Sequence, residues 1–161
     1  MAKLRAEQLT TGEPLVRSGG ILIESSAEEI FELLASPQRH AEFDGSKTVQ
    51  RQISGPRRLF LGAKFAMSMR IKIPYRISNT VVAFEPARVI AWRHFGRHIW
   101  RYELTPISST STWVTESFDG RPSLSQFWLA RINAYENNQK AILKSLVKLK
   151  EVNGKIILEW F

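Results

Sequence analysis

The sequence predicts an α+β fold, because strand-like and helix-like patterns occupy separate parts of the chain. Apolar and polar residues alternate with a period of two through much of residues 48–119, as they do in half-exposed strands. After Pro122, apolar residues recur three and four positions apart, which is the spacing of one helical face. The links between the expected strands are short. We therefore expect a curved antiparallel sheet of about seven strands, wrapped around one long C-terminal helix.

The N-terminal part of the chain predicts one strand followed by two short helices. Residues 1–15 form a polar arm, and VRSGGILIESS, residues 16–26, has the pattern of a strand. Ser25 or Ser26 can cap the next helix, since a serine oxygen accepts a hydrogen bond from a free N–H at a helix start. Pro37 interrupts the apolar pattern of that helix, so PQRHAEFD is expected to form a second short helix or helical turn.

The segment KFAMSMRIKI, residues 64–73, is one of the clearest expected strands. Its alternation places five apolar side chains on one face, namely Phe65, Met67, Met69, Ile71 and Ile73. The other expected strands of the meander are TVQRQIS, RLFLG, YRISNTVVAFEP, RVIAWRHF, HIWRYELTP and TSTWVTESFD.

The expected final helix opens after Pro122, with Ser123 as its cap, and stops near Asn153-Gly154. Its apolar stripe is interrupted by one amide and consists of Trp128, Ile132, Tyr135, Gln139, Ile142, Leu146 and Leu149. The chain has no internal repeat and no low-complexity linker. We therefore expect a single domain over residues 16–153, followed by an apolar tail over residues 154–161.

Composition narrows the range of functions. The absence of cysteine excludes disulfides, zinc knuckles and thiol chemistry. The formal net charge of +8 favours weak attraction to anionic partners, but the basic residues are spread over several regions, which indicates a basic soluble surface. The first residues lack the apolar run of a signal peptide, and no stretch approaches the roughly 18 apolar residues of a membrane helix. We expect a cytoplasmic protein with no membrane span.

Four stretches carry a resemblance to a known superfamily: ILIESSAEEIFELLASPQRHAEFDGS, YRISNTVVAFEPARVIAW, WRYELTP and TWVTESFD. In these residues and in the order of its elements, the chain resembles the helix-grip fold of the START-related and birch-pollen-allergen-like proteins (SRPBCC). Within that group it is most similar to the bacterial polyketide cyclase/dehydratase and lipid-transport family. The resemblance covers about residues 17 to 150. It implies a hydrophobic cavity that holds a lipid-like, aromatic or polyketide-like ligand.

The segment IAWRHFGRHIWRYELTP, residues 90–106, predicts a hairpin with Gly96-Arg97 as a two-residue loop. In that register Arg93 lies opposite Trp100, and residues that lie opposite each other share a face of the sheet. We assign Trp100 and Tyr102 to the inner face because their row is the more apolar. Arg93 then faces the cavity. The outer face carries a stacked cation–π pair, Trp92 and Arg101.

Four polar side chains are expected to reach this cavity: Asn79, Arg93, Glu116 and Gln139. An isolated buried charge is too unfavourable, so Arg93 needs either Glu116 or an anionic group of the ligand as its partner. The apolar wall would consist of Met67, Met69, Tyr75, Ile77, Trp100, Tyr102, Phe118, Trp128, Ile132 and Tyr135. The same residues are compatible with a buried ion pair and core amides that join helix to sheet without any ligand.

Three functions fit these observations. The first is binding, with or without transport, of a hydrophobic, lipid-like or aromatic small molecule in the cavity. The second is a cofactor-free cyclase or dehydratase, in which Arg93 holds an enolate or carboxylate while Glu116 or Tyr102 moves a proton. The third is an interaction module that binds another macromolecule through its basic surface or tail, with the cavity collapsed.

Other partners have less support in the sequence. No cofactor is expected, since Walker and dinucleotide fingerprints are absent, and the histidines do not converge on a metal site. Nucleic acid is a weaker candidate, because the long helix would cover the aromatic row on which bases stack. The tail KIILEWF has three candidate roles: it continues the helix, covers the cavity mouth, or docks on a second subunit in a homodimer.

Overall fold

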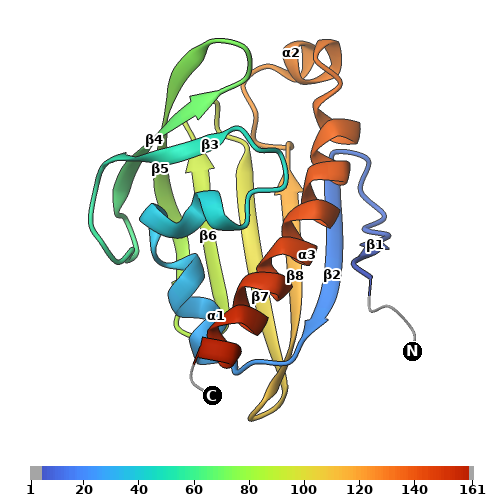
Figure 1. The fold of residues 1–161 in the computed structure, drawn as a ribbon. Helices are drawn as coiled ribbons and strands as arrows, with labels where there is room; N and C mark the ends of the chain where they lie inside the picture. The colour runs from blue at the N-terminus through green and yellow to red at the C-terminus, as the bar shows by residue number, and fades with distance from the viewer. Residues whose placement is uncertain (1–4, 160–161) are drawn as a thin grey trace.

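The computed structural model describes residues 5–159, with side chains described for residues 5–153. It shows a broad curved sheet with the last helix lying across one face (Figure 1). In chain order the elements are β1 (Glu7–Leu9), β2 (Val16–Ile23), α1 (Ala27–Leu34), the 3₁₀ helix η1 (Pro37–Glu42), β3 (Val49–Ser54), β4 (Lys64–Arg70), β5 (Pro74–Glu85), β6 (Val89–His94), β7 (Ile99–Ser108), β8 (Ser111–Asp119), α2 (Gln126–Arg131) and α3 (Ala134–Glu159).

Eight strands form one antiparallel sheet in the order β1-β2-β8-β7-β6-β5-β4-β3. Six of them, β3 to β8, follow one another as the predicted meander, and β2 closes onto β8. The predicted α+β class and curved antiparallel sheet are confirmed. Strand β1 is an addition, because it forms within the stretch expected to be a polar arm and pairs with β2. The opposite edge strand, β3, pairs with β4 through two register shifts.

Helix α1 begins as the sequence predicts. The Ser26 side chain accepts a hydrogen bond from the backbone N–H of Glu29 at 3.2 Å, which satisfies one free donor of the first turn. Ile30, Phe31 and Leu34 are buried on its inner face. The stretch that starts at Pro37 forms η1, the second short helix.

Two expectations for the region around β4 are wrong. RLFLG does not form a strand; instead Leu59 is fully buried, and its backbone N–H donates to the Ala35 carbonyl at 2.8 Å. Ile71 and Ile73 do not continue the inward row, because β4 ends at Arg70 and the chain turns at Lys72, which has a φ of 80°. Their side chains are exposed. The alternation that predicted one long strand therefore continued through a turn.

The predicted final helix is broken near its start. Helix α2 has only six residues, with Ser125 as its cap rather than Ser123, and Asn133 then adopts a left-handed φ of 54° before α3 begins. This break turns Trp128 and Ile132 outward, where both are exposed. From Ala134 onward the stripe is correct, since Ile142, Leu146 and Leu149 are completely buried.

The helix does not stop at Asn153-Gly154, because α3 continues to Glu159. The backbone of the tail thus extends the helix. The side chains of residues 154–161 lie outside the described residues, as does the backbone of residues 160–161, so covering of the cavity and docking on a second subunit stay predictions.

The segment after η1 is fastened to the middle of α3. The Gly45 N–H donates to the Ser145 hydroxyl at 2.8 Å, and the Lys148 ammonium donates to the Asp44 carbonyl at 3.3 Å. The Asp44 carboxylate in turn accepts hydrogen bonds from the backbone N–H groups of Ser46, Thr48 and Val49. These bonds hold residues 44–49 as a strap between the end of η1 and the helix.

Substituting Gly45 with alanine should detach this strap. A β-carbon at Gly45 would lie 2.5 Å from the backbone nitrogen of Ser145 and 2.7 Å from the Ala141 carbonyl oxygen, and a helix backbone cannot move aside cheaply. We expect Gly45→Ala to lower the free energy of unfolding by about 2–3 kcal/mol, as overpacking does. Chemical denaturation measures this change. Gly96→Ala is the matched control, since its nearest contact would be 3.6 Å away, and an equal loss in both variants would contradict the steric explanation.

Candidate functional site

The hairpin of β6 and β7 differs from the predicted register by one residue. Trp92 pairs with Trp100, and Arg93 pairs with Ile99. The loop has three residues instead of two: the His94 N–H donates to the His98 carbonyl at 3.0 Å, and the Arg97 N–H donates to the His94 carbonyl at 2.9 Å. Arg97 takes the left-handed position of this loop, with a φ of 74°.

This shift exchanges the two faces of β6. Trp92 is buried in the core at 9% exposure, whereas Arg93 is exposed on the outer face. The predicted inward orientation of Arg93 and its pairing with Glu116 are therefore wrong, and so is the stack of Trp92 on Arg101. Arg101 instead pairs with Glu103 at 2.6 Å.

The interior between the sheet and the helical layer contains a cluster of rings around Trp92. The His40 ring stacks on Trp92 with a centroid distance of 5.0 Å, and Phe65 and Tyr102 each lie 5.9 Å from the indole. Phe43 closes the group at 5.5 Å from His40. His40 also donates to the Leu34 carbonyl at 2.8 Å, which fixes its orientation. Burial lowers the pKa of His40 to about 4, so its ring is neutral at pH 7.

A buried carboxyl group lies beside this ring cluster. Glu116 on β8 is paired with Tyr102 on β7, is 4% exposed, and receives a hydrogen bond from the Tyr102 hydroxyl. Burial raises the pKa of Glu116 to about 8, the tyrosine hydrogen bond lowers it, and the negative charge of Asp44 raises it. Glu116 is therefore mostly protonated at pH 7. Its Oε2 atom has no hydrogen-bond partner among the described residues.

Gln139 places a second unpartnered oxygen near the same strands. Its side-chain nitrogen donates to the Ser18 carbonyl on β2 at 3.2 Å, and the Ser18 hydroxyl donates to the backbone carbonyl of Glu116. The Gln139 Oε1 atom is buried and finds no partner within the described part of the chain. Unpartnered buried polar atoms are uncommon in folded proteins, so two such oxygens on neighbouring elements indicate a place where another polar group belongs.

The other predicted wall residues fall into four groups. Met67, Met69, Ile77 and Phe118 are buried as expected. Trp100 and Tyr135 are partly buried and pack against Phe118, with ring distances of 5.1 Å and 5.7 Å. The predicted inward orientation is wrong for Trp128 and Ile132, which are 59% and 60% exposed. Tyr75 lies on the inner strand face beside Met69, as predicted, but it is 39% exposed because this part of β5 extends beyond β6.

Tyr102 is the one ring of this cluster that was predicted for the site. Trp92 was placed on the outer face, and Phe65 was not named among the wall residues. No orientation was predicted for the other two rings, His40 and Phe43. Both lie in the short segment at and after η1, where no strand or long-helix periodicity marks a facing direction. The one available signal was the pair of aromatic rings three residues apart, which helical geometry places on one side of a 3₁₀ turn.

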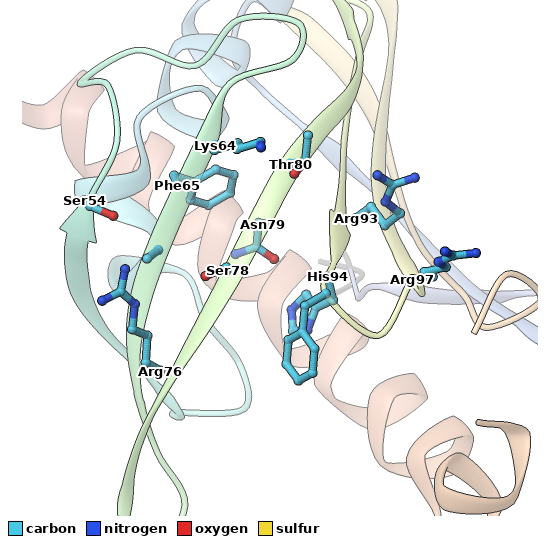
Figure 2. Close-up of a pocket in the computed structure, with 12 residues that line it drawn as sticks. Ser54, Lys64, Phe65, Arg76, Ser78, Asn79, Thr80, Arg93, His94 and Arg97 are labelled. Atoms are coloured by element: carbon cyan, nitrogen blue, oxygen red, sulfur yellow. The ribbon is translucent and has the colours of Figure 1, made fainter. Parts of the chain in front are cut away.

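Asn79 belongs to a different place from Glu116 and Gln139. It lies on β5, three strands from β8, and lines a pocket of about 610 Å³ between the β4–β5 hairpin and the β6–β7 turn (Figure 2). A second pocket of about 660 Å³ lies between residues 45–47 and α3. Neither of these pockets is lined by Trp92, Tyr102 or Glu116. In the interior, the rings of His40, Phe65 and Tyr102 pack against Trp92.

Among the described residues, no group of three or more histidine, aspartate or glutamate side chains is placed to hold a metal ion. Within the same residues, no helix combines the length and apolar character needed to cross a membrane.

The chain has sequence relatives over part of its length. No family model matches the chain. The uncharacterized protein Rv0088 of Mycobacterium tuberculosis is 41% identical over 103 residues, which is 63% of this chain and 46% of that protein. The chain thus matches about half the length of this relative.

Solved structures match over most of the chain. The Polyketide_cyc-like protein Cgl2372 from Corynebacterium glutamicum is 21% identical, covers 92% of this chain and 97% of its own, and has a TM-score of 0.62. An AHSA1-like protein from Aeromonas hydrophila is 15% identical, covers 80% and 91%, and has a TM-score of 0.54. At these identities the likeness concerns the fold. The resemblance to the START-related superfamily is confirmed at that level, and the chain has the helix-grip fold that these proteins share.

Proposed function

We propose that the protein binds a hydrophobic small molecule carrying one polar group, in the interior between the sheet and α3. The observation that carries this proposal is the protonated, partly unpartnered carboxyl of Glu116 beside a cluster of aromatic rings. An apolar surround with few polar groups is the usual composition of a small-molecule site.

Glu116 suits such a ligand because it is neutral at pH 7. A protonated carboxyl donates one hydrogen bond, so it can bind a carbonyl or hydroxyl oxygen without bringing a charge into an apolar interior. Gln139 offers an acceptor oxygen on the helix side. Because rings occupy the interior, ligand entry requires the rings or the strap at residues 44–49 to move. Arg93 has no part in this site.

A second candidate is a cofactor-free cyclase or dehydratase, and the pKa of Glu116 favours it. A general acid or base works best when its pKa lies near the working pH, and Glu116 has a pKa of about 8. Tyr102, whose own pKa is raised by burial and by Glu116, stays protonated and donates to that carboxyl. The Glu116 carboxyl would give its proton to a bound enolate, or its carboxylate would take one from the α-carbon of the corresponding carbonyl compound.

The proposal is tested with Nile red, a neutral apolar dye that is not attracted by the basic surface. We expect saturable fluorescence enhancement at pH 7 and at least a threefold loss of affinity by about pH 9, where Glu116 is ionised. Glu116→Gln should abolish this pH dependence, since glutamine stays neutral. The exposed Glu103→Gln is the control and should behave like the unmodified protein.

Native mass spectrometry of the purified protein provides the second measurement. A co-purifying apolar molecule supports the proposal, and turnover of a polyketide-like substrate that is lost in Glu116→Gln would favour the enzyme. Dye binding that does not saturate, together with the absence of any bound mass, would overturn both candidates and favour the interaction module.

A further inference from the structure

The pocket of about 610 Å³ lies where one hairpin extends beyond another. Residues 74–78 of β5 pair only with β4, because the pairing of β5 with β6 begins at Asn79 and His94. The β4–β5 hairpin thus projects past the β6–β7 turn and forms a corner with it (Figure 2). This volume is the size of a small-molecule site. We call this pocket the corner pocket.

Positive charge is concentrated in the corner pocket. Its lining includes four cationic side chains and no carboxylate: Lys64, Arg76, Arg93 and Arg97. Lys64 pairs with Thr80, and Thr80 pairs with Arg93, so these three side chains form one row on the outer face of three adjacent strands. Figure 2 shows this row. None of the four cations has an ion-pair partner among the residues whose side chains are described.

Hydroxyl groups complete the polar lining. Ser54, Ser78 and Thr80 line the pocket, and hydroxyls both donate and accept hydrogen bonds. Asn79 also borders the pocket, but it pairs with the buried Phe65 and its side chain therefore lies on the inner face of the sheet. Hydroxyls beside a cationic row match a ligand that carries a hydroxyl next to its anionic group.

The turn adds an arginine at a position that favours glycine. Arg97 has a φ of 74°, and side chains other than glycine, asparagine and aspartate rarely adopt this left-handed conformation. The chain places Gly96 one position earlier and keeps an arginine in the strained place. A strained conformation at a pocket rim is consistent with a role for that side chain.

We propose that the corner pocket binds a phosphate-bearing small molecule that also carries a hydroxyl group, such as a phosphorylated sugar or nucleotide. Arginine guanidinium groups match phosphate with two parallel hydrogen bonds, and lysine adds a point charge. Arg93 and Lys64 would hold the phosphate from opposite ends of their row. The Thr80 hydroxyl, which lies between them in the row, would accept a hydrogen bond from the hydroxyl of the ligand. This site is separate from the interior site of the proposed function.

Isothermal titration calorimetry with inorganic pyrophosphate and with ribose 5-phosphate tests the proposal. We expect saturable binding of both at low salt, weakened but still measurable at about 0.15 M salt, because the exposed part of a charge interaction is screened. The double variant Arg76→Gln/Arg93→Gln should weaken binding of both probes at least tenfold. Thr80→Val, which removes the hydroxyl and keeps the shape of the side chain, should weaken binding of ribose 5-phosphate at least threefold more than binding of pyrophosphate, which has no sugar hydroxyl.

The matched control is Arg101→Gln, on the outer face of β7. Arg101 lies opposite Ala91 and is already paired with Glu103, so the variant removes positive charge near the corner pocket without touching its lining. Its affinity for pyrophosphate should change less than twofold. Far-ultraviolet circular dichroism confirms that each variant is folded.

Three outcomes would overturn the proposal. One is a loss of pyrophosphate affinity in Arg101→Gln equal to that in the double variant, which would show that the probe is held by general charge attraction. Another is the absence of saturable pyrophosphate binding. The third is binding of vesicles of phosphatidylglycerol and phosphatidylcholine, or of a mixed single-stranded oligonucleotide, that depends on Arg76 and Arg93 while neither small probe binds. That last result would assign these cations to a macromolecular surface.

Discussion

Replacing Trp92 with alanine is expected to lower the free energy of unfolding by about 3–5 kcal/mol, as large truncations in a core do. The indole is 9% exposed and touches three rings, those of His40, Phe65 and Tyr102. Removing it leaves a cavity that this interlocked cluster cannot close without breaking the His40 hydrogen bond to Leu34. Urea denaturation measures the loss. Circular dichroism is the suitable signal, because the variant lacks Trp92 and its tryptophan fluorescence cannot be compared directly with that of the unmodified protein.

The neighbouring Arg93→Ala is the control for this prediction. Arg93 is exposed on the opposite face of the same strand, so its truncation should change stability by less than about 0.5 kcal/mol. The two variants together test the register of the hairpin. If the loop had two residues, Arg93 would face inward and Trp92 outward, and the order of the two effects would be reversed.

Stability is expected to fall as the pH rises from about 6.5 to 8, and the reason is Glu116. Its pKa is about 8 in the folded protein and 4.5 in its ordinary state, so between these values the folded protein holds a proton that the unfolded chain has released. Stability therefore falls with rising pH, by up to about 1.4 kcal/mol per pH unit. The stabilisation that comes from the bound proton is lost as the pH passes 8, where the folded protein releases it as well. The loss between pH 6.5 and 8 amounts to about 2 kcal/mol.

Denaturation curves at several pH values test this expectation. Glu116→Gln removes the titrating group and should be less sensitive to pH across the same window, whereas the exposed Glu103→Gln should keep the full slope. His40 contributes in the opposite direction near pH 6.5, because burial lowers its pKa to about 4 while the unfolded chain still binds a proton near the ordinary value of 6.5. The contribution of Glu116 is therefore the difference between the unmodified protein and Glu116→Gln. Identical profiles in these two proteins would show that Glu116 is ionised or hydrated inside the fold.

The architecture could be predicted from the sequence because it depends on patterns repeated over many residues. The alternation in β4, β5 and β8 and the stripe from Gln139 to Leu149 each contain several residues that agree, so one misplaced residue does not change the result. The start of α1 was predicted to within one residue, as Ser25 or Ser26, and the structure assigns the cap to Ser26.

The prediction of the site depended on single residues and was less accurate. The hairpin offered two loop lengths that differ by one residue, and choosing the shorter loop exchanged Trp92 with Arg93. The break at Asn133 has no proline or glycine to mark it, so the exposure of Trp128 and Ile132 was missed. Glu116, Gln139 and Tyr102 were correctly placed inside, because the apolar alternation of β7 and β8 and the stripe of α3 identify the inner face without the hairpin register.

The irregular pairing of β3 has a consequence for how these molecules behave when crowded. An open sheet edge is a template for another chain, and a flat edge strand invites strand-to-strand growth into aggregates. The two register shifts in β3 interrupt its outward row of N–H and C=O groups, and Arg51 adds a charge at one of them. A second molecule could not pair along this edge in one continuous register. We infer that this edge resists the intermolecular sheet growth by which concentrated solutions of β-rich proteins precipitate.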